Sequence, residues 1–519
     1  MTRSKWLTLL VAGFLAVLAA RQWAAISGEP APREAVNNLL ESADGPTLTV
    51  PPGQPTPTSI PTREPLPRDT LVEYTIQTGD SLTTLAAHFH TTVEAIREAN
   101  PDVRLGLTTL PPGLTIHIPY YYIPTWGSAF KILPDPLFVY GPAVADTNWE
   151  AFVAQYPGWL KDYSGYAADQ ERTGINMLLH VARNYSVSPY VLLALLEYQA
   201  GALSRPEYPG PYMLGFEGYD HKGLYLQLSA AAKWLNHGYY GWRLGRIGAW
   251  TLSDHTEVRP DPWLNAATVA LQFYFAQKLP ARVYRQAISP QGFFRTYATL
   301  FGDPWNPPPQ PHLPGNLTQP RLILPIPDNR AWSYTGGPHP AWGRRLWPWS
   351  AIDLAPPEVR GCAVSRQWAV AEADGVVVRS EEGILMLDLD GDGDERTGWV
   401  IFHLHLSDRL PVGTWVRAGD PLGRPSCEGG HSTGSHVHFA RKYNGEWMDP
   451  AGPVPWIMEG WQVLPGPEPY TGWMRRDGQY VRACECGSPD TLIRAWRGGP
   501  PEANATPGPA SSSASGERP

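Results

Sequence analysis

The sequence predicts a multidomain α+β protein with a small βααβ domain, an all-α middle domain and a C-terminal antiparallel β-sheet domain. Three observations indicate this fold class. The chain has 519 residues, a length that favours about three domains over a single core. Strong helical periodicity occurs within residues 121–315. Short apolar segments separated by Gly- and Asp-rich turns, typical of antiparallel strands, follow within residues 316–498.

The first 27 residues are predicted to be a signal peptide or a membrane anchor. Arg3 and Lys5 precede an apolar run at 7–20, which suits a signal peptide and is short for a membrane span. We therefore expect an extracytoplasmic protein that is secreted or membrane-anchored. Residues 28–70, rich in Pro and Thr, are predicted to form an extended linker. The tail, 499–519, is predicted to be disordered from its composition.

The net charge of −8 gives no basic footprint, so we do not expect nucleic acid as a partner. An exported protein can form disulfides, and its four cysteines allow three pairings. We favour a Cys362–Cys427 bridge, because these two residues bracket the candidate site in the sequence. Cys484 and Cys486 can form a local bridge or remain thiols.

Residues 71–120 have a βααβ pattern. Apolar and polar residues alternate at both ends, with short helical patterns at 81–89 and 93–100 between them. A turn and a helix N-cap are predicted at 78–81. The segment resembles a LysM domain over its full length, at Tyr74, Gly79-Asp80-Ser81-Leu82, Ala86, Ile96, Asn100 and Leu114-x-Ile116-x-Ile118-Pro119.

The LysM resemblance implies a domain that binds glycans containing N-acetylglucosamine. It places the glycan contacts at Thr78, Gly79, Asp80, Ser81 and Asn100. A LysM fold with weak or lost affinity for sugar is the alternative.

Helical periodicity in the middle domain is strongest at 174–185, 189–200, 224–237 and 263–278. The first two segments resemble the opening helices of lytic transglycosylases, which end in a catalytic Glu-Ser pair. Here the pair is Gln199-Ala200, and Gln cannot protonate a glycosidic oxygen. The resemblance implies a degenerate, lysozyme-like domain that binds glycan or acts as a spacer. Glycan cleavage by another carboxylate is an open alternative.

The most informative motif is His436-Val437-His438. Alternate residues of a strand share a face, so these two imidazoles are predicted to project together. The same argument places His403 and His405 on one face, with His403 at the rim of a site. Such pairs suit a metal centre in which one His binds the ion and another transfers protons.

Two further pieces supply partners for these histidines. Asp353 lies in a short predicted strand, 350–355, and is expected at its end. His339 follows Gly336-Gly337-Pro338, where a sharp turn is predicted to aim its side chain inward.

Together these pieces resemble the LytM/lysostaphin-type zinc metalloendopeptidases over roughly residues 320–455. The matching motifs are the IDLAP segment around Asp353, His405-Leu406, Thr433-Gly434-Ser435-His436-Val437-His438-Phe439 and Pro450. Most members carry a zinc-binding His four residues before the Asp, where this chain has Trp349. The beta-lytic branch instead places this His further upstream, in a Gly-Gly-Pro-His segment, which corresponds to His339.

The resemblance therefore implies one Zn²⁺ held by His339, Asp353 and His438, with His405 and His436 as the catalytic pair. Three protein ligands leave one position of a zinc ion open, as in catalytic sites. One His would take a proton from zinc-activated water, and the other would stabilise the oxyanion or protonate the leaving amine. Which of the two is the base stays open.

The predicted function is an exported peptidoglycan hydrolase that cleaves cell-wall peptide bonds and is targeted to glycan strands by its LysM domain. The main alternative is a non-catalytic LytM-type scaffold or activator of a cell-wall amidase. The scissile bond and the oligomeric state stay open.

An acidic segment resembles the first half of a calcium loop, with Asp388, Asp390, Asp392 and Asp394 at alternate positions. The twelfth position from Asp390 is Ile401, where such loops carry Glu. We favour a solvated hairpin tip over a Ca²⁺ site.

Overall fold

The computed structural model of the chain describes residues 66–67, 70–103, 108–121, 127–343, 345–358 and 360–497. The predicted signal peptide or anchor, nearly all of the linker and the tail lie outside these residues. Within the described ranges, no helix is both long and apolar enough to cross a membrane.

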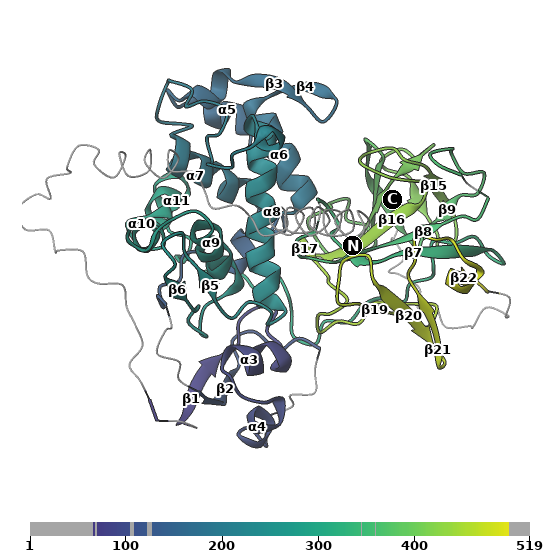
Figure 1. Ribbon diagram of the computed structural model, residues 1–519, viewed down its shortest axis with the longest axis horizontal. Helices are drawn as coiled ribbons and strands as arrows, with labels where there is room; N and C mark the ends of the chain where they lie inside the picture. Colours follow the sequence, from purple (N-terminus) through teal and green to yellow (C-terminus); the bar gives the residue numbers. More distant parts are fainter. Residues whose placement is uncertain are drawn as a thin grey trace, which may run out of the picture.

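The N-terminal domain has the predicted βααβ order. Strands β1 (Thr70–Thr75) and β2 (Thr115–Tyr120) pair antiparallel, and α3 (Leu82–His88) and α4 (Val93–Glu98) lie between them in sequence. The predicted N-cap is present, because the hydroxyl of Ser81 accepts a hydrogen bond from the Thr84 N–H. The domain lies beside the end of the long helix α8 (Leu224–Arg243), where His88 stacks on Trp242 at 3.5 Å between ring centroids (Figure 1).

The middle domain is mainly helical. Its helices are α5 (Trp149–Ala154), α6 (Gly174–Tyr185), α7 (Pro189–Ala200), α8, α9 (Ala266–Ala276), α10 (Ala281–Ala287) and α11 (Phe293–Phe301), with 3-10 turns η1 (Asp135–Leu137), η2 (Trp159–Asp162) and η3 (Tyr219–His221). The predictions at 174–185 and 189–200 are confirmed to the residue. The domain is not all-α, however, because it also contains the hairpins β3 (Ser164–Ala167)–β4 (Gln170–Thr173) and β5 (Trp250–Thr251)–β6 (Glu257–Val258).

The C-terminal domain is built on a nine-stranded sheet with the order β14-β10-β11-β12-β16-β8-β7-β22, in which β17 also pairs with β16. All of the pairings are antiparallel, as predicted. The strands are β7 (Ala331–His339), β8 (Ala351–Ala355), β10 (Gly375–Glu381), β11 (Ile384–Asp388), β12 (Trp399–Leu404), β14 (Trp415–Val416), β16 (Val437–Tyr443), β17 (Glu446–Trp447) and β22 (Leu492–Arg494).

Two smaller sheets complete this domain. One joins β13 (Leu406–Ser407), β15 (Pro421–Pro425) and β9 (Ala369–Val370). The other joins β18 (Ile457–Met458), β19 (Trp461–Pro465), β20 (Gly472–Arg476) and β21 (Gln479–Arg482), with the 3-10 turn η4 (Pro489–Thr491) following. The apolar segment 321–327, one of those expected to form strands, forms only an isolated bridge from Leu322 to Met458.

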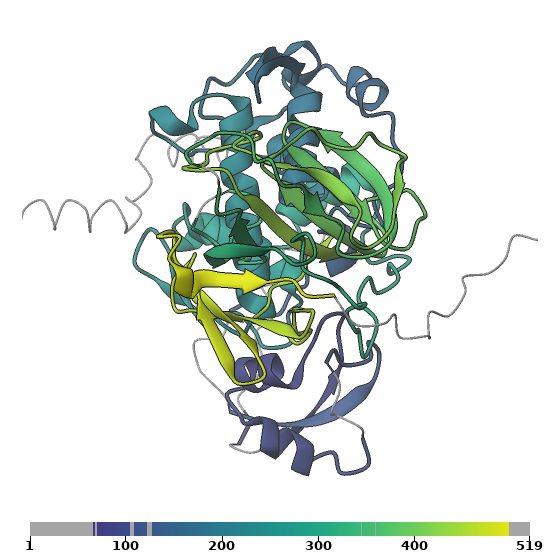
Figure 2. The same ribbon diagram turned by 90° about the vertical axis from the view of Figure 1, so that its right-hand side faces the viewer.

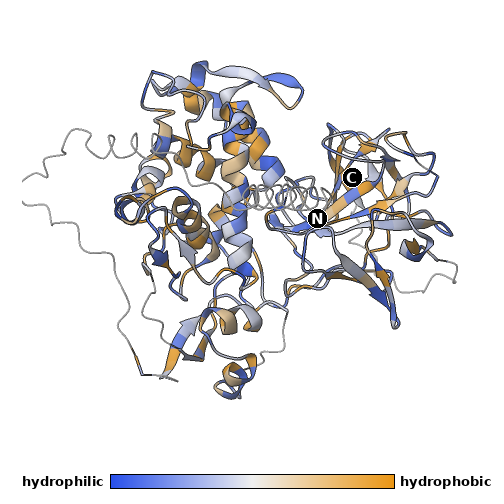
Figure 3. Ribbon diagram, in the orientation of Figure 1, coloured by the Kyte–Doolittle hydropathy of each residue, from blue (hydrophilic) through white to orange (hydrophobic). Residues whose placement is uncertain are grey.

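Both faces of the main sheet are covered. Leu385, Ile401 and Phe439 belong to the core of the C-terminal domain itself. Their sequence neighbours Met386, Phe402 and Ala440 point to the other face and share a single core with helices α6 to α9. Figures 1 and 2 show the helical domain lying along the sheet, with its helix α8 on the side that faces the sheet. Apolar residues concentrate in the buried helices α7 and α9 and in the central strands (Figure 3).

The acidic segment forms the tip between β11 and β12. Asp388 accepts hydrogen bonds from the N–H groups of Asp390 and Gly393, and Asp394 pairs with Arg396 at 2.6 Å. Carboxylate oxygens of Asp388, Asp390 and Asp392 do lie within 4.8 Å of one another. These contacts are those of a hairpin tip, and a calcium site there stays a prediction without support.

Both disulfides form. Cys362 bonds to Cys427, as favoured from the sequence, and Cys484 bonds to Cys486. The first bridge ties the loop after β8 to the loop before the His436 motif.

Arg243, at the C-terminal end of α8, joins all three domains. Its guanidinium lies 3.0 Å from Asp135 of the middle domain and 3.2 Å from Glu446 of the C-terminal domain. It also donates a hydrogen bond to the carbonyl oxygen of Thr78 in the N-terminal domain. Only 9% of its side chain is exposed. His312 lies 2.6 Å from Glu446, so the acid has two basic neighbours.

We expect Arg243→Ala to lower the free energy of unfolding by about 3–5 kcal/mol, because it leaves Asp135 and Glu446 buried without their common partner. Urea denaturation of the full chain would measure this change. Arg282→Ala, at an exposed position of α10, is the matched control and should change stability by less than about 0.5 kcal/mol. Equal stabilities of the two variants would contradict this prediction.

Acid should weaken the same contact. Burial raises the pKa of Glu446, but Arg243 and His312 outweigh it and hold that pKa at about 2. The pKa of Glu in an unfolded chain is about 4.3. Ionised Glu446 therefore stabilises the fold fully above that pH, and this stabilisation is lost as the pH falls toward 2. The stability of the wild type should therefore fall more steeply between pH 5 and 3 than that of Glu446→Gln. Parallel pH profiles would contradict this expectation.

Candidate metal centre

The predicted ligands lie on three neighbouring strands of the main sheet. Strand β8 lies between β16 and β7, and its Asp353 is directly opposite His438 of β16. Asp353 also pairs with Gly336 of β7, and His339 ends that strand opposite Ala351. Asp353 thus lies in the middle of its strand, not at the end as predicted.

The expected Gly-Gly-Pro turn is wrong, since these residues lie within β7. Irregular pairing with β8 occurs on both sides of Gly336 and shifts the register that brings His339 to the site. Gly336 is required because a Cβ there would overlap the Asp353 carboxylate. A Cβ on Gly337 would overlap the backbone of Thr471. The two glycines thus allow Asp353 and the backbone of Thr471 to lie close to β7.

The three donor atoms have the spacing that a zinc ion needs. His339 Nε2 lies 2.9 Å from His438 Nδ1 and 3.3 Å from Asp353 Oδ1, and His438 Nδ1 lies 3.0 Å from the same oxygen. Tetrahedral zinc with bonds of about 2.0–2.1 Å separates its ligand atoms by roughly 3.3 Å. The residues are at least nine-tenths buried.

Backbone carbonyls fix which nitrogen of each ring faces the site. His339 Nδ1 lies 2.7 Å from the carbonyl oxygen of Gly337, and His438 Nε2 lies 3.0 Å from that of Ala341. A carbonyl can only accept, so the hydrogen of each neutral ring is on this outer nitrogen. The inner nitrogens then present lone pairs to each other and to an anionic carboxylate. Burial also lowers the pKa of His438, which favours the neutral ring. This donor set fits a divalent cation.

His405 and His436 lie next to this group, with their rings 4.7 Å apart. Their outer nitrogens also donate to carbonyl oxygens, His405 to Glu428 at 2.8 Å and His436 to Gly434 at 2.7 Å. His436 Nε2 reaches within 3.5 Å of Asp353. Burial lowers the pKa of His405 to about 3, so this ring is neutral at pH 7. The structure therefore brings together all five predicted residues.

The prediction for His403 is wrong. Strand β12 ends at Leu404, and His405 has a left-handed backbone with φ of 65°, so the two histidines do not share a regular strand face. His403 is fully buried and contacts both carboxylate oxygens of Glu372, at 2.9 and 3.0 Å. It cannot contact a substrate. Trp349 is also structural, and its N–H donates to Asp449.

Sequence reasoning missed two residues of the site. The ring of Tyr470 stacks on His339 at 4.0 Å between centroids, in a loop that pairs with Gly337 and Pro338. Glu485, between the bonded Cys484 and Cys486, lies beside His436. Neither residue lies in a motif, so only the packing of the C-terminal strands reveals them.

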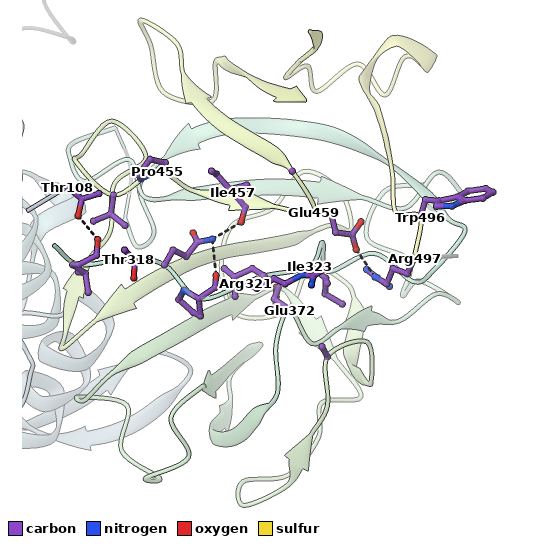
Figure 4. Close-up of a pocket in the computed structure, with 17 residues that line it drawn as sticks. Thr108, Thr318, Arg321, Ile323, Glu372, Pro455, Ile457, Glu459, Trp496 and Arg497 are labelled. Atoms are coloured by element: carbon purple, nitrogen blue, oxygen red, sulfur yellow. Dashed lines mark hydrogen bonds and ion pairs between the residues drawn. The ribbon is translucent and has the colours of Figure 1, made fainter. Parts of the chain in front are cut away.

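The site opens into two adjoining cavities of about 450 and 770 Å³, which share Asp353, Thr433, His436 and Glu485. A larger cavity of about 920 Å³ lies elsewhere, between residues 317–323 and 454–460 (Figure 4). The charged pair Glu459–Arg497 lies in it, but none of the five candidate residues does. We therefore assign chemistry to the smaller cavities.

The residues predicted to bind glycan are mostly engaged within the protein. Thr78, Ser81 and Asn100 are buried, and Thr78 exchanges hydrogen bonds with Leu313. Asp80 accepts hydrogen bonds from Tyr74 and Gln77. A Cβ on Gly79 would overlap Arg243. Their role in glycan binding stays a prediction.

Two family models match the chain. The model described as LysM domain matches residues 74–119, and the one described as LasA, N-terminal domain, matches residues 131–316. The second covers nearly all of the helical domain. The lysozyme-like character predicted for that domain is not tested by this match.

Known proteins resemble longer parts of the chain. Protease LasA of Pseudomonas aeruginosa strain UCBPP-PA14 is 26% identical over 339 residues, which are 61% of this chain and 74% of that protein. Beta-lytic metalloendopeptidase of Achromobacter lyticus is 27% identical over 134 residues, which are 24% of this chain and 34% of that protein.

Among solved structures, the M23 metalloprotease pseudoalterin is 24% identical, with a TM-score of 0.28, and the match covers 32% of this chain and 96% of that chain. The catalytic domain of lysostaphin from Staphylococcus simulans is 24% identical, with a TM-score of 0.17, over 24% of this chain and 90% of that one. The two family models and the similarity to LasA and beta-lytic metalloendopeptidase support a LytM-type metallopeptidase with a LysM domain.

Proposed function

We propose that this protein is an exported zinc endopeptidase that hydrolyses peptide bonds of peptidoglycan and is directed to the wall by its LysM domain. One observation carries the proposal: two imidazole nitrogens with inward lone pairs and one carboxylate converge beside a second pair of oriented histidines. Homology to LasA and beta-lytic metalloendopeptidase supports the peptidase class.

The residues have separable tasks. His339, Asp353 and His438 would hold zinc, which when bound supplies a Lewis acid for the scissile carbonyl and lowers the pKa of water. His405 donates its Nδ1–H to Glu428, which leaves the lone pair of Nε2 available to accept a proton. His436 holds its outer N–H on Gly434 and aims Nε2 at the same space, where it can contact the developing oxyanion or the leaving amine.

An extracytoplasmic location agrees with two closed disulfides, which persist in oxidising compartments. The LysM domain and the LasA homology favour peptidoglycan as the polymer that is bound and cleaved.

The alternative of a non-catalytic scaffold predicts loss of ligands or of their orientation. Here all five side chains converge, and a backbone carbonyl holds the outer nitrogen of each of the four histidines. Such outer contacts are typical of working metal and proton-transfer sites.

Glycan cleavage by the middle domain has no comparable support. Gln199 accepts a hydrogen bond from Tyr274 at 2.7 Å. Glu197 accepts hydrogen bonds from the N–H groups of Leu203 and Ser204, so its carboxylate stabilises the turn after α7.

We expect the full chain to bind about one zinc ion and His339→Ala to lose most of it, because two ligands cannot hold the ion tightly. Zinc would be measured by elemental analysis after dialysis, and the shift in Tm on adding zinc would report binding independently of activity. The full chain is needed, since the sheet shares a core with the helical domain.

The matched control for this experiment is His431→Ala, an exposed His on the same loop as His436, which should keep its zinc. Zinc at full stoichiometry in His339→Ala would exclude His339 as a ligand. A wild type that neither binds zinc nor cleaves wall peptides would favour the scaffold.

His405→Ala should separate proton transfer from metal binding. We expect normal zinc content and a kcat for wall peptides lowered by about 10²–10⁴-fold, the usual contribution of a general acid or base. Rates would be compared at equal zinc occupancy. A loss of less than tenfold would show that His405 does not transfer the proton.

A further inference from the structure

Two cavities adjoin at the candidate site. Both are lined by Asp353 and His436, so a ligand that contacts these residues has access to each cavity. The 770 Å³ cavity is walled by the loop after β8, by residues 433–436 and by the loop after β21.

Two residues of opposite charge line this cavity. Arg360 and Glu485 line it, and among the described residues neither side chain has an ion pair or a hydrogen bond. Asp353, the third charged residue of the wall, is already surrounded by His339, His436 and His438. The cavity therefore offers one anion and one cation for a ligand.

Both charges are carried by loops that are held in place. Glu485 lies in the small ring closed by Cys484 and Cys486, and the N–H of Cys484 donates to Tyr334 of β7. Beside Arg360, Gly361 accepts hydrogen bonds from the N–H of Ser435 at 2.8 Å and from its hydroxyl at 3.2 Å. The next residue, Cys362, is bonded to Cys427. The backbones that carry these two side chains are thus held near His436.

We propose that Glu485 and Arg360 form a specificity subsite for a substrate residue that bears both a free ammonium and a free carboxylate beside the scissile bond. Glu485 pairs with the ammonium and Arg360 with the carboxylate. An unpaired charge beside the bound substrate favours a group of opposite charge over a neutral one. The inference rests on the proposed peptidase function and adds its substrate class.

Glu485 acts on the substrate rather than on the metal. It is exposed, whereas the predicted ligands are buried.

The test uses the zinc-loaded full chain and four peptides with the same scissile bond. The neighbouring residue carries both charged groups, only the ammonium, only the carboxylate, or neither, through acetylation and amidation. We expect the wild type to prefer the doubly charged peptide over the neutral one by about 5–30-fold in kcat/KM, mainly through KM, and less at 0.5 M salt.

Two variants test the preference for the ammonium and the preference for the carboxylate separately. Glu485→Gln should lose only the discrimination between free and acetylated ammonium, and Arg360→Gln only that between free and amidated carboxylate. Glu468→Gln, an exposed acid outside both cavities, is the matched control and should keep both. The control Glu468→Gln should cleave all four peptides at the wild-type rate.

Equal kcat/KM values of the wild type for all four peptides would overturn the subsite and leave the peptidase function standing. A preference that survives in both variants would also overturn it. No cleavage of any peptide by a zinc-loaded wild type would instead refute the proposed function.

Discussion

The pairing of β16, β8 and β7 is the constraint on which the candidate site depends. The pairing of β16 with β8 places His438 opposite Asp353. The pairing of β7 with β8 is irregular on both sides of Gly336, and this shift in register places His339 near Asp353. The carboxylate occupies space that any side chain at Gly336 would fill. Register and a missing Cβ therefore set the distances between the donor atoms, and carbonyl oxygens set the orientation of the rings. One residue of slippage would turn His438 to the opposite face.

The sheet is stabilised from both sides. Its inner face belongs to the C-terminal domain, and its other face shares a core with α6 to α9. Hydrogen bonds extend this contact, because the Tyr240 hydroxyl accepts from the N–H of Trp447 and the Ser186 hydroxyl donates to Gly445. Without the helical domain, Met386, Phe402 and Trp447 would be exposed. The strands that carry the site thus depend on residues far away in the sequence.

Sequence patterns sufficed where the chemistry is local. The periodicity at 174–185 and 189–200 predicts α6 and α7 to the residue, and the five site residues lie in recognisable motifs. The failures have tertiary causes. Alternation places His403 beside His405, but the left-handed backbone at His405 breaks the strand there. Gly336 and Gly337 predict a turn, whereas packing partners require their small size. Tyr470 and Glu485 reach the site only through strand pairings in the C-terminal sheets.

Tertiary contacts also change the interpretation of the LysM loop at 78–81. The LysM resemblance implies a glycan-binding surface there, yet Arg243 lies against Gly79 and donates a hydrogen bond to Thr78. The Thr78 hydroxyl also accepts a hydrogen bond from the N–H of Leu313. The guanidinium and a sugar cannot occupy that space together. Arg243 also pairs with Asp135 and Glu446, so its displacement would deprive two buried carboxylates of the guanidinium that they share. A ligand that contacts Gly79 and Thr78 from the side of Arg243 would therefore have to displace this side chain from the three-domain contact.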